Sequence, residues 1–131
     1  MIKDLNFPSD IGNLRLVEKA IDELSLELDL SDEVYGNVLV ATMEATNNAI
    51  IHGNRSDPDK KVRIEIKMIN KELMVHIEDQ GKGFDHMNIP DPTAPENLLK
   101  IGGRGVFLMR QLSDDVSFYD NGSTVEICFR I

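Results

Sequence analysis

The stretch Glu44-Ala-Thr-Asn-Asn-Ala-Ile-Ile-His-Gly-Asn54 ends a run of helix-forming residues and closes with a typical C-terminal helix signal, Gly53-Asn54. The sequence therefore predicts a helix over about residues 32–52. Glu44 and Asn48 stand four positions apart, so both project from the same face of this helix. A carboxylate beside an amide suits a magnesium ion with a general base next to it. The alternative is a solvated polar stripe, which is the commoner explanation of any isolated pair.

Periodicity predicts the elements on both sides of this helix. Upstream, Ser9 or Asp10 is a candidate N-cap for an amphipathic helix. Its apolar stripe consists of Leu14, Val17, Ile21, Leu24 and Leu28. Downstream, alternating apolar and polar residues predict two strands, over residues 62–68 and 73–79.

The last third of the chain predicts one helix and a β-hairpin. The helix covers residues 105–112, and the two strands cover residues 116–120 and 124–131, joined by the hairpin signal Asn121-Gly122. We therefore expect one α+β domain over residues 1–131. It is a two-layer sandwich in which helices cover one face of a mostly antiparallel sheet.

Asp79 is the first candidate binding residue after the predicted strands. It continues the face marked by Leu73, Val75 and Ile77, where an unpaired carboxylate is costly. The glycines of Gln80-Gly81-Lys82-Gly83 allow the backbone to approach a flat ligand closely. A carboxylate at the rim of an apolar pocket suits the exocyclic amine of adenine. Two alternatives are a solvated turn and a calcium loop, although the latter lacks the terminal glutamate of an EF-hand.

A second glycine-rich turn, Gly102-Gly103-Arg104-Gly105, stands directly before the helix predicted over residues 105–112. Free backbone N–H groups at a helix N-terminus bind anions, and Arg104 adds a cation there. The Gly-Lys-Ser/Thr ending of a P-loop is absent. The alternative, a glycine-rich hinge, is compatible with phosphate binding.

Composition limits the partners of the chain. The 131 residues carry a formal net charge of −9, which argues against a general nucleic-acid binder. An acidic protein that binds ATP needs a divalent cation and backbone N–H groups for the phosphates. No apolar run suits a membrane span or a signal peptide, and Cys128 is the single cysteine. We therefore expect a cytoplasmic protein.

Three segments together resemble the GHKL (Bergerat-fold) ATPase superfamily: residues 44–54, residues 78–84 and residues 103–109. The likeness is greatest to the bacterial anti-sigma factor serine/threonine kinases and switch-protein kinases. It extends over nearly the whole chain and includes the run Gly122-Ser-Thr-Val-Glu-Ile. It implies a Bergerat fold, with a mixed, largely antiparallel sheet and an ATP lid over about residues 85–102.

The resemblance also implies a role for each candidate residue. Glu44 matches the catalytic base and Asn48 the magnesium ligand. Asp79 matches the aspartate that reads adenine. The other nucleotide-binding positions are Gly81 and Gly83 around adenine, Gly103, Arg104 and Gly105 at the phosphates, and Thr124 in support of the adenine contact.

The function implied by the resemblance is that of an ATP- and Mg²⁺-dependent protein serine/threonine kinase. Its substrate would be an anti-sigma-factor antagonist, and it would also bind a sigma factor, with a homodimer as a further expectation. One alternative is a non-catalytic, ATP-dependent protein-binding switch. A remoter alternative is a fragment of a sensor histidine kinase.

Overall fold

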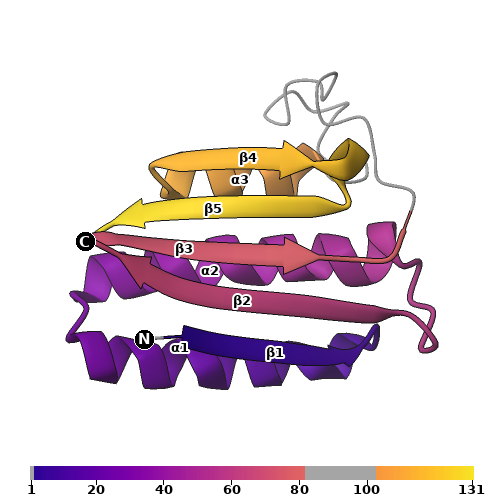
Figure 1. The fold of residues 1–131 in the computed structure, drawn as a ribbon, viewed down its shortest axis with the longest axis horizontal. Helices are drawn as coiled ribbons and strands as arrows, with labels where there is room; N and C mark the ends of the chain where they lie inside the picture. Colours follow the sequence, from indigo (N-terminus) through magenta and orange to yellow (C-terminus); the bar gives the residue numbers. More distant parts are fainter. Residues whose placement is uncertain (1, 82–102) are drawn as a thin grey trace.

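A five-stranded antiparallel sheet lies in front of three helices in the computed structural model, which describes residues 2–81 and 103–131 (Figure 1). The strands are β1 (Ile2–Pro8), β2 (Lys61–Ile69), β3 (Glu72–Glu78), β4 (Asp115–Tyr119) and β5 (Thr124–Arg130), in the order β1-β2-β3-β5-β4. All four pairings are antiparallel. The predicted α+β class and two-layer arrangement are confirmed, and the parallel pairing of a mixed sheet is not found among the described strands.

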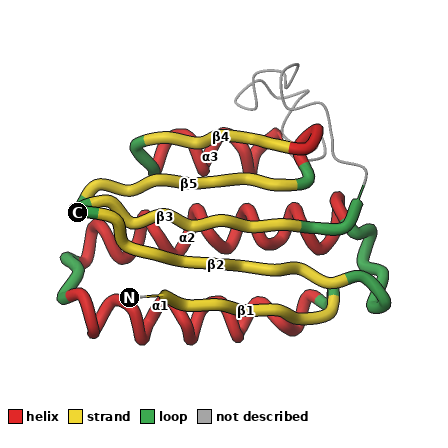
Figure 2. The backbone as a smooth tube through the Cα atoms, viewed as in Figure 1, coloured by secondary structure: helices red, strands yellow, loops and turns green. Residues whose placement is uncertain are grey.

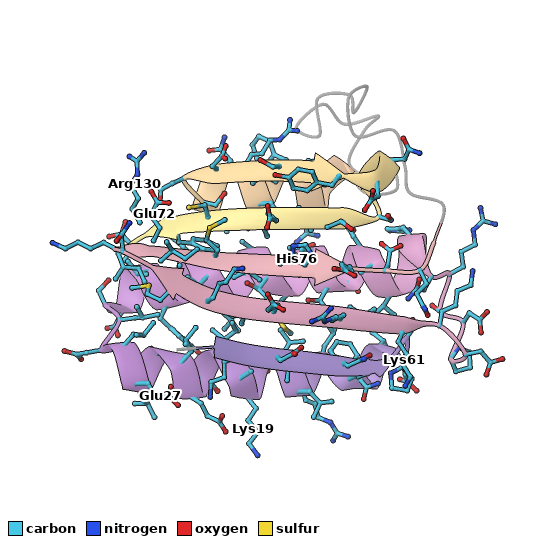
Figure 3. The ribbon with its side chains drawn as sticks, viewed as in Figure 1. Lys19, Glu27, Lys61, Glu72, His76 and Arg130 are labelled. Carbon is cyan, nitrogen blue, oxygen red and sulfur yellow. The ribbon has the colours of Figure 1, made fainter. Side chains whose placement is uncertain are left out.

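Strict alternation of side chains sets the register of the sheet. Ile66 pairs with Val75, and Val75 pairs with Ile127, so buried apolar residues line one face across three strands. His76 projects from β3 on the opposite face, turned toward the viewer in Figure 3. There its two ring nitrogens lie 2.7 Å from Glu78 and 3.2 Å from Glu126.

The helices cover the apolar face of the sheet (Figure 2). Helix α1 (Leu14–Leu28) follows a short 3-10 turn capped by Asp10, and helix α2 (Asp32–Asn48) is capped by Ser31. Helix α3 (Gly103–Leu112) packs against α2. The predicted stripe of α1 is confirmed, with Val17, Ile21 and Leu24 fully buried. No helix in the described part of the chain is long and apolar enough to cross a membrane.

Besides shifts of about one residue at strand ends, the structure differs from the predicted elements in three places. Helix α2 ends at Asn48 and continues as a π-helical turn, Ala49–Gly53. Helix α3 begins at Gly103, two residues before the predicted start. The β4–β5 loop has four residues, because Tyr119 pairs with Thr124 and residues 120–122 form a 3-10 turn. The loop predicted over residues 121–123 was therefore one residue too short, although the hairpin itself is confirmed.

Candidate functional site

Asp79 follows the last residue of β3 and is held by backbone contacts on both sides. Its N–H donates to the Ser123 carbonyl over 2.9 Å, and its carboxylate accepts from the Gly81 N–H over 2.8 Å. Burial raises the pKa of the Asp79 carboxyl from 3.8 to about 6, against the lowering effects of the Gly81 N–H and of Lys60. A desolvated acceptor of this kind binds an incoming N–H donor strongly.

Two glycines pack against this carboxylate. A Cβ atom on Gly53 would lie 2.3 Å from both Cγ and one oxygen of Asp79, and a Cβ atom on Gly81 would lie 1.9 Å from the Gly53 carbonyl oxygen. A side chain at Gly81 would require a backbone shift, and one at Gly53 would displace the Asp79 carboxylate. The sequence indicated a binding role for Gly81 but only a helix end for Gly53. The π-helical turn that brings Gly53 to Asp79 has no signal in the sequence, and such irregularities are frequent at functional sites.

A cavity with about 320 Å³ of empty space, part of it open to solvent, adjoins Asp79. Its lining is mostly apolar and comes from α2, the π-helical turn, β3, α3 and the β4–β5 hairpin. The lining residues are Ala45, Asn48, Ala49, Gly53, Ile77, Asp79, Met109, Phe118, Gly122, Ser123 and Val125. An apolar slot with a single carboxylate is suited to a flat heterocycle that carries an N–H donor.

Thr124 does not line this cavity, although sequence reasoning assigned it to the adenine contact. It pairs with Glu78, and its hydroxyl lies 3.5 Å from a carboxylate oxygen of Asp120. The cavity lining instead includes Ser123 and Val125, one residue to either side. Ser123 lines the cavity and its carbonyl accepts from the Asp79 N–H, whereas the role of Thr124 beside adenine stays a prediction.

Glu44 and Asn48 lie next to the start of α3. A Cβ atom on Gly105 would be 2.8 Å from Nδ2 of Asn48 and 3.3 Å from Oε2 of Glu44. Both polar side chains are half-buried, and Nδ2 of Asn48 has no hydrogen-bond partner among the described residues. The two residues predicted for catalysis and for the metal thus meet the first turn of the helix predicted to bind phosphate.

Of the remaining predicted positions, some lie in the first turn of α3 and the others lie in the segment that is not described. Arg104 is exposed in the first turn of α3, and Gly103 is the first residue of that helix. Gly83, Gly102 and the lid predicted over residues 85–102 lie outside the described residues.

A nucleotide fits the arrangement of the described residues. Among the described residues, the buried amide nitrogen of Asn48 lacks a partner, and Gly53, Gly81 and Gly105 allow close packing around the side chains of Asp79 and Asn48. The apolar slot adjoins Asp79, and the first turn of a ten-residue helix adjoins Asn48. Such a helix start favours anions. Within the described part of the chain, no group of three or more His, Cys, Asp or Glu side chains is suited to a metal ion.

Comparisons with known proteins agree with this geometry. The family profile described as "Histidine kinase-like ATPase domain" matches residues 7–129. The chain is 26% identical over 128 residues to serine-protein kinase RsbW of Listeria innocua, with 92% of this chain and 82% of the relative covered. It is 30% identical over 115 residues to an anti-sigma F factor of Clostridium botulinum, with 85% and 79% covered.

A solved structure shares the fold. The crystal structure of the RsbU and RsbW domains of Rv1364c from Mycobacterium tuberculosis superposes with a TM-score of 0.72 at 14% identity. The match covers 99% of this chain and 32% of that longer chain, so it shows the fold alone. Together with the profile match and the curated relatives, it leads to one conclusion: the chain belongs to the histidine kinase-like ATPase family, within which these relatives are anti-sigma factors and serine-protein kinases.

Proposed function

We propose that the chain is an ATP- and Mg²⁺-dependent protein serine/threonine kinase that phosphorylates an anti-sigma-factor antagonist and binds a sigma factor. The observation that carries the proposal is the meeting of Glu44, Asn48 and Gly105 at the start of α3, where Asn48 lines the same cavity as Asp79. This arrangement provides a general base and an amide ligand beside a phosphate-binding helix start.

Each residue of the site has a chemical task in this proposal. The Asp79 carboxylate accepts a hydrogen bond from the exocyclic amine of adenine. The oxygen of the Asn48 amide is a ligand for Mg²⁺. Because Mg²⁺ in such sites is held by one or two protein oxygens and by phosphate oxygens, a single amide ligand is sufficient. Glu44 orients the serine or threonine hydroxyl of the partner and accepts its proton. ATP supplies the phosphoryl group that the hydroxyl receives.

The carboxylate of Glu44 separates a kinase from a binding module. In Glu44→Gln the side chain keeps its size but cannot accept the proton, so we expect ATP binding within about threefold of the wild type and phosphoryl transfer reduced by about 10²-fold or more. Transfer is measured with labelled ATP, Mg²⁺ and the candidate antagonist. Glu33→Gln, at an exposed position in the first turn of α2, is the matched control.

Two outcomes would contradict the proposal. If the wild type binds ATP but labels no antagonist, the chain is a nucleotide-dependent binding switch. If Glu44→Gln transfers phosphate at the wild-type rate, Glu44 is not the base.

The named relatives support the proposed partners, because one is a serine-protein kinase and the other an anti-sigma factor. Partners of this kind favour a cytoplasmic location, which is part of the same proposal. A homodimer is part of the same proposal, and size-exclusion chromatography with light scattering tests it. A single species of monomer mass at micromolar concentration would exclude a stable dimer.

A further inference from the structure

Asn54 is a fully buried polar residue directly beside the adenine end of the site, with 0% of its surface exposed. Its side chain is in contact with three separate segments. Nδ2 donates to the Ser9 hydroxyl over 2.7 Å and to the Lys61 carbonyl over 3.0 Å, and Oδ1 accepts from the Gln80 N–H over 2.7 Å. Asn54 thus joins the end of β1, the start of β2 and the turn that follows Asp79.

The backbone around Asn54 is held in an unusual conformation. Arg55 and Ser56 both have positive φ angles, of 53° and 56°, which are costly for residues other than glycine. The Asn54 N–H donates to Ala49 and the Ser56 N–H donates to Ile50, each over 2.8 Å. These bonds fix the π-helical turn whose last residue, Gly53, lies against the Asp79 carboxylate.

The turn after β3 is therefore connected to Asn54 in two ways. Gly53 precedes Asn54 in the chain and contacts Asp79, while Gln80 follows Asp79 and donates to the Asn54 side chain. A second bond closes the network, because the Lys61 N–H donates to the Gln80 side chain over 2.7 Å. Removal of the Asn54 amide frees the Gln80 N–H and loosens the segment on which the Asp79 carboxylate is carried.

We infer that Asn54 is a positioning residue that gives the site its selectivity for adenine, because it holds the Asp79 carboxylate in place between Gly53 and Gly81. This inference deepens the proposed function and rests on its nucleotide site. The chemistry predicts a selective effect. Adenine presents an amine to Asp79, whereas guanine presents a carbonyl oxygen at that position and gains nothing from a well-placed carboxylate.

The test compares ATP and GTP affinities of the wild type with those of Asn54→Ala and Asn54→Ser. We expect ATP binding to weaken about tenfold in both variants, which corresponds to the loss of the hydrogen bond from adenine to the charged Asp79 carboxylate. GTP binding is expected to change less than about threefold. The ratio of the two affinities is the decisive readout, because a general loss of stability weakens both nucleotides alike. Binding is measured in TMAO, which favours the folded state.

Two control variants lower stability without reaching the Asp79 turn. Ser9→Ala removes one partner of Asn54 but leaves its bonds to Lys61 and Gln80. Ile66→Val trims the core of β2 at a residue that is 1% exposed. Both are expected to keep the wild-type ratio of ATP to GTP affinity, with lower melting temperatures.

The possible outcomes separate this inference from the proposed function. An unchanged ratio in both Asn54 variants overturns the inference, and so does failure of both to fold in TMAO where Ser9→Ala folds, because Asn54 would then serve the whole fold. A wild type that binds ATP and GTP equally overturns the role of Asp79 and the inference with it. A wild type that binds neither nucleotide contradicts the proposed function itself.

Discussion

At the scale of single residues, the ionised carboxylate of Asp79 lowers the stability of the folded protein, because it is partly buried. Burial raises the pKa of its carboxyl to about 6, so at neutral pH the protein holds a charged group in surroundings that favour the neutral form. The folded-state pKa lies above the unfolded value of 3.8. The contribution of Asp79 to folding is therefore fully present below pH 4 and is lost as the pH rises through 6.

Asp79→Asn should therefore stabilise the free protein while it weakens nucleotide binding. At pH 7 we expect the free energy of unfolding to rise by up to about 1 kcal/mol, a value reduced for the partial exposure of the group. ATP affinity should fall by about 10-fold to 100-fold, because the amide presents a donor to the adenine amine. Urea unfolding and calorimetric titration measure the two effects. Asp59→Asn, at an exposed position in the loop before β2, is the control, and a destabilised Asp79→Asn protein would contradict the expected gain in stability.

The same carboxyl predicts a pH dependence of binding. Below about pH 6 Asp79 takes up a proton, and ATP affinity of the wild type should fall through this range. The phosphates of ATP titrate nearby, so the informative quantity is the ratio of wild-type to Asp79→Asn affinity at each pH. We expect this ratio to decline toward one between pH 7 and pH 5. A constant ratio would show that the ionised carboxylate does not bind the nucleotide.

At the scale of elements, two helical glycines offer a matched pair of substitutions. A Cβ atom on Gly36 in α2 meets nothing within 4 Å, whereas one on Gly105 in α3 lies 2.8 Å from the Asn48 amide. Gly36→Ala should raise the free energy of unfolding by about 0.5–1 kcal/mol and leave ATP binding unchanged. Gly105→Ala gains the same helix propensity but displaces Asn48, so ATP binding should weaken at least about tenfold. Equal binding by the two variants would place Gly105 outside the site.

Most elements could be predicted because their signals are local. The stripe of α1 and the alternation in β2 and β3 depend on neighbours within a few residues, and both appear in the structure. The π-helical turn and the four-residue β4–β5 loop could not be predicted in this way. The first depends on how Gly53 meets Asp79, and the second on pairing of Tyr119 with Thr124.

The candidate site residues that belong to a sequence motif could be predicted. Those that only the folded packing brings to the site could not. Glu44, Asn48 and Asp79 stand in recognisable segments, and the structure brings the first two to the start of α3. Ser123 was not identified because the run Gly122-Ser-Thr offers two adjacent hydroxyls, and only the folded β4–β5 hairpin brings Ser123 to the cavity lining. Asn54 was predicted only as part of a helix end. Its three side-chain bonds reach segments distant in the sequence, and such contacts leave no local pattern.

At the scale of the whole molecule, the site joins the two layers at one end. The π-helical turn after α2 and the end of β3 meet through Gly53 and Asp79, and α3 meets α2 through Gly105 and Asn48. Figure 2 shows α2 and β3 ending on the same side of the molecule. A ligand that contacts all of these segments in the folded protein, and none of them together in the unfolded chain, must stabilise the fold as a whole.

Mg²⁺ should control how strongly ATP stabilises the protein. With ATP at about 100 times its dissociation constant, the wild type should gain about 2.7 kcal/mol of stability, a rise of roughly 10 °C in melting temperature. EDTA should remove most of this rise, because Asn48 contributes through the ion. Asn48→Ala should therefore show a small rise that is insensitive to EDTA, whereas Asn47→Ala, its half-buried neighbour on α2, should keep the full response. A wild type whose rise is the same with and without EDTA would show that the nucleotide is held without a metal, and Asn48 would then lose its assigned role as a ligand.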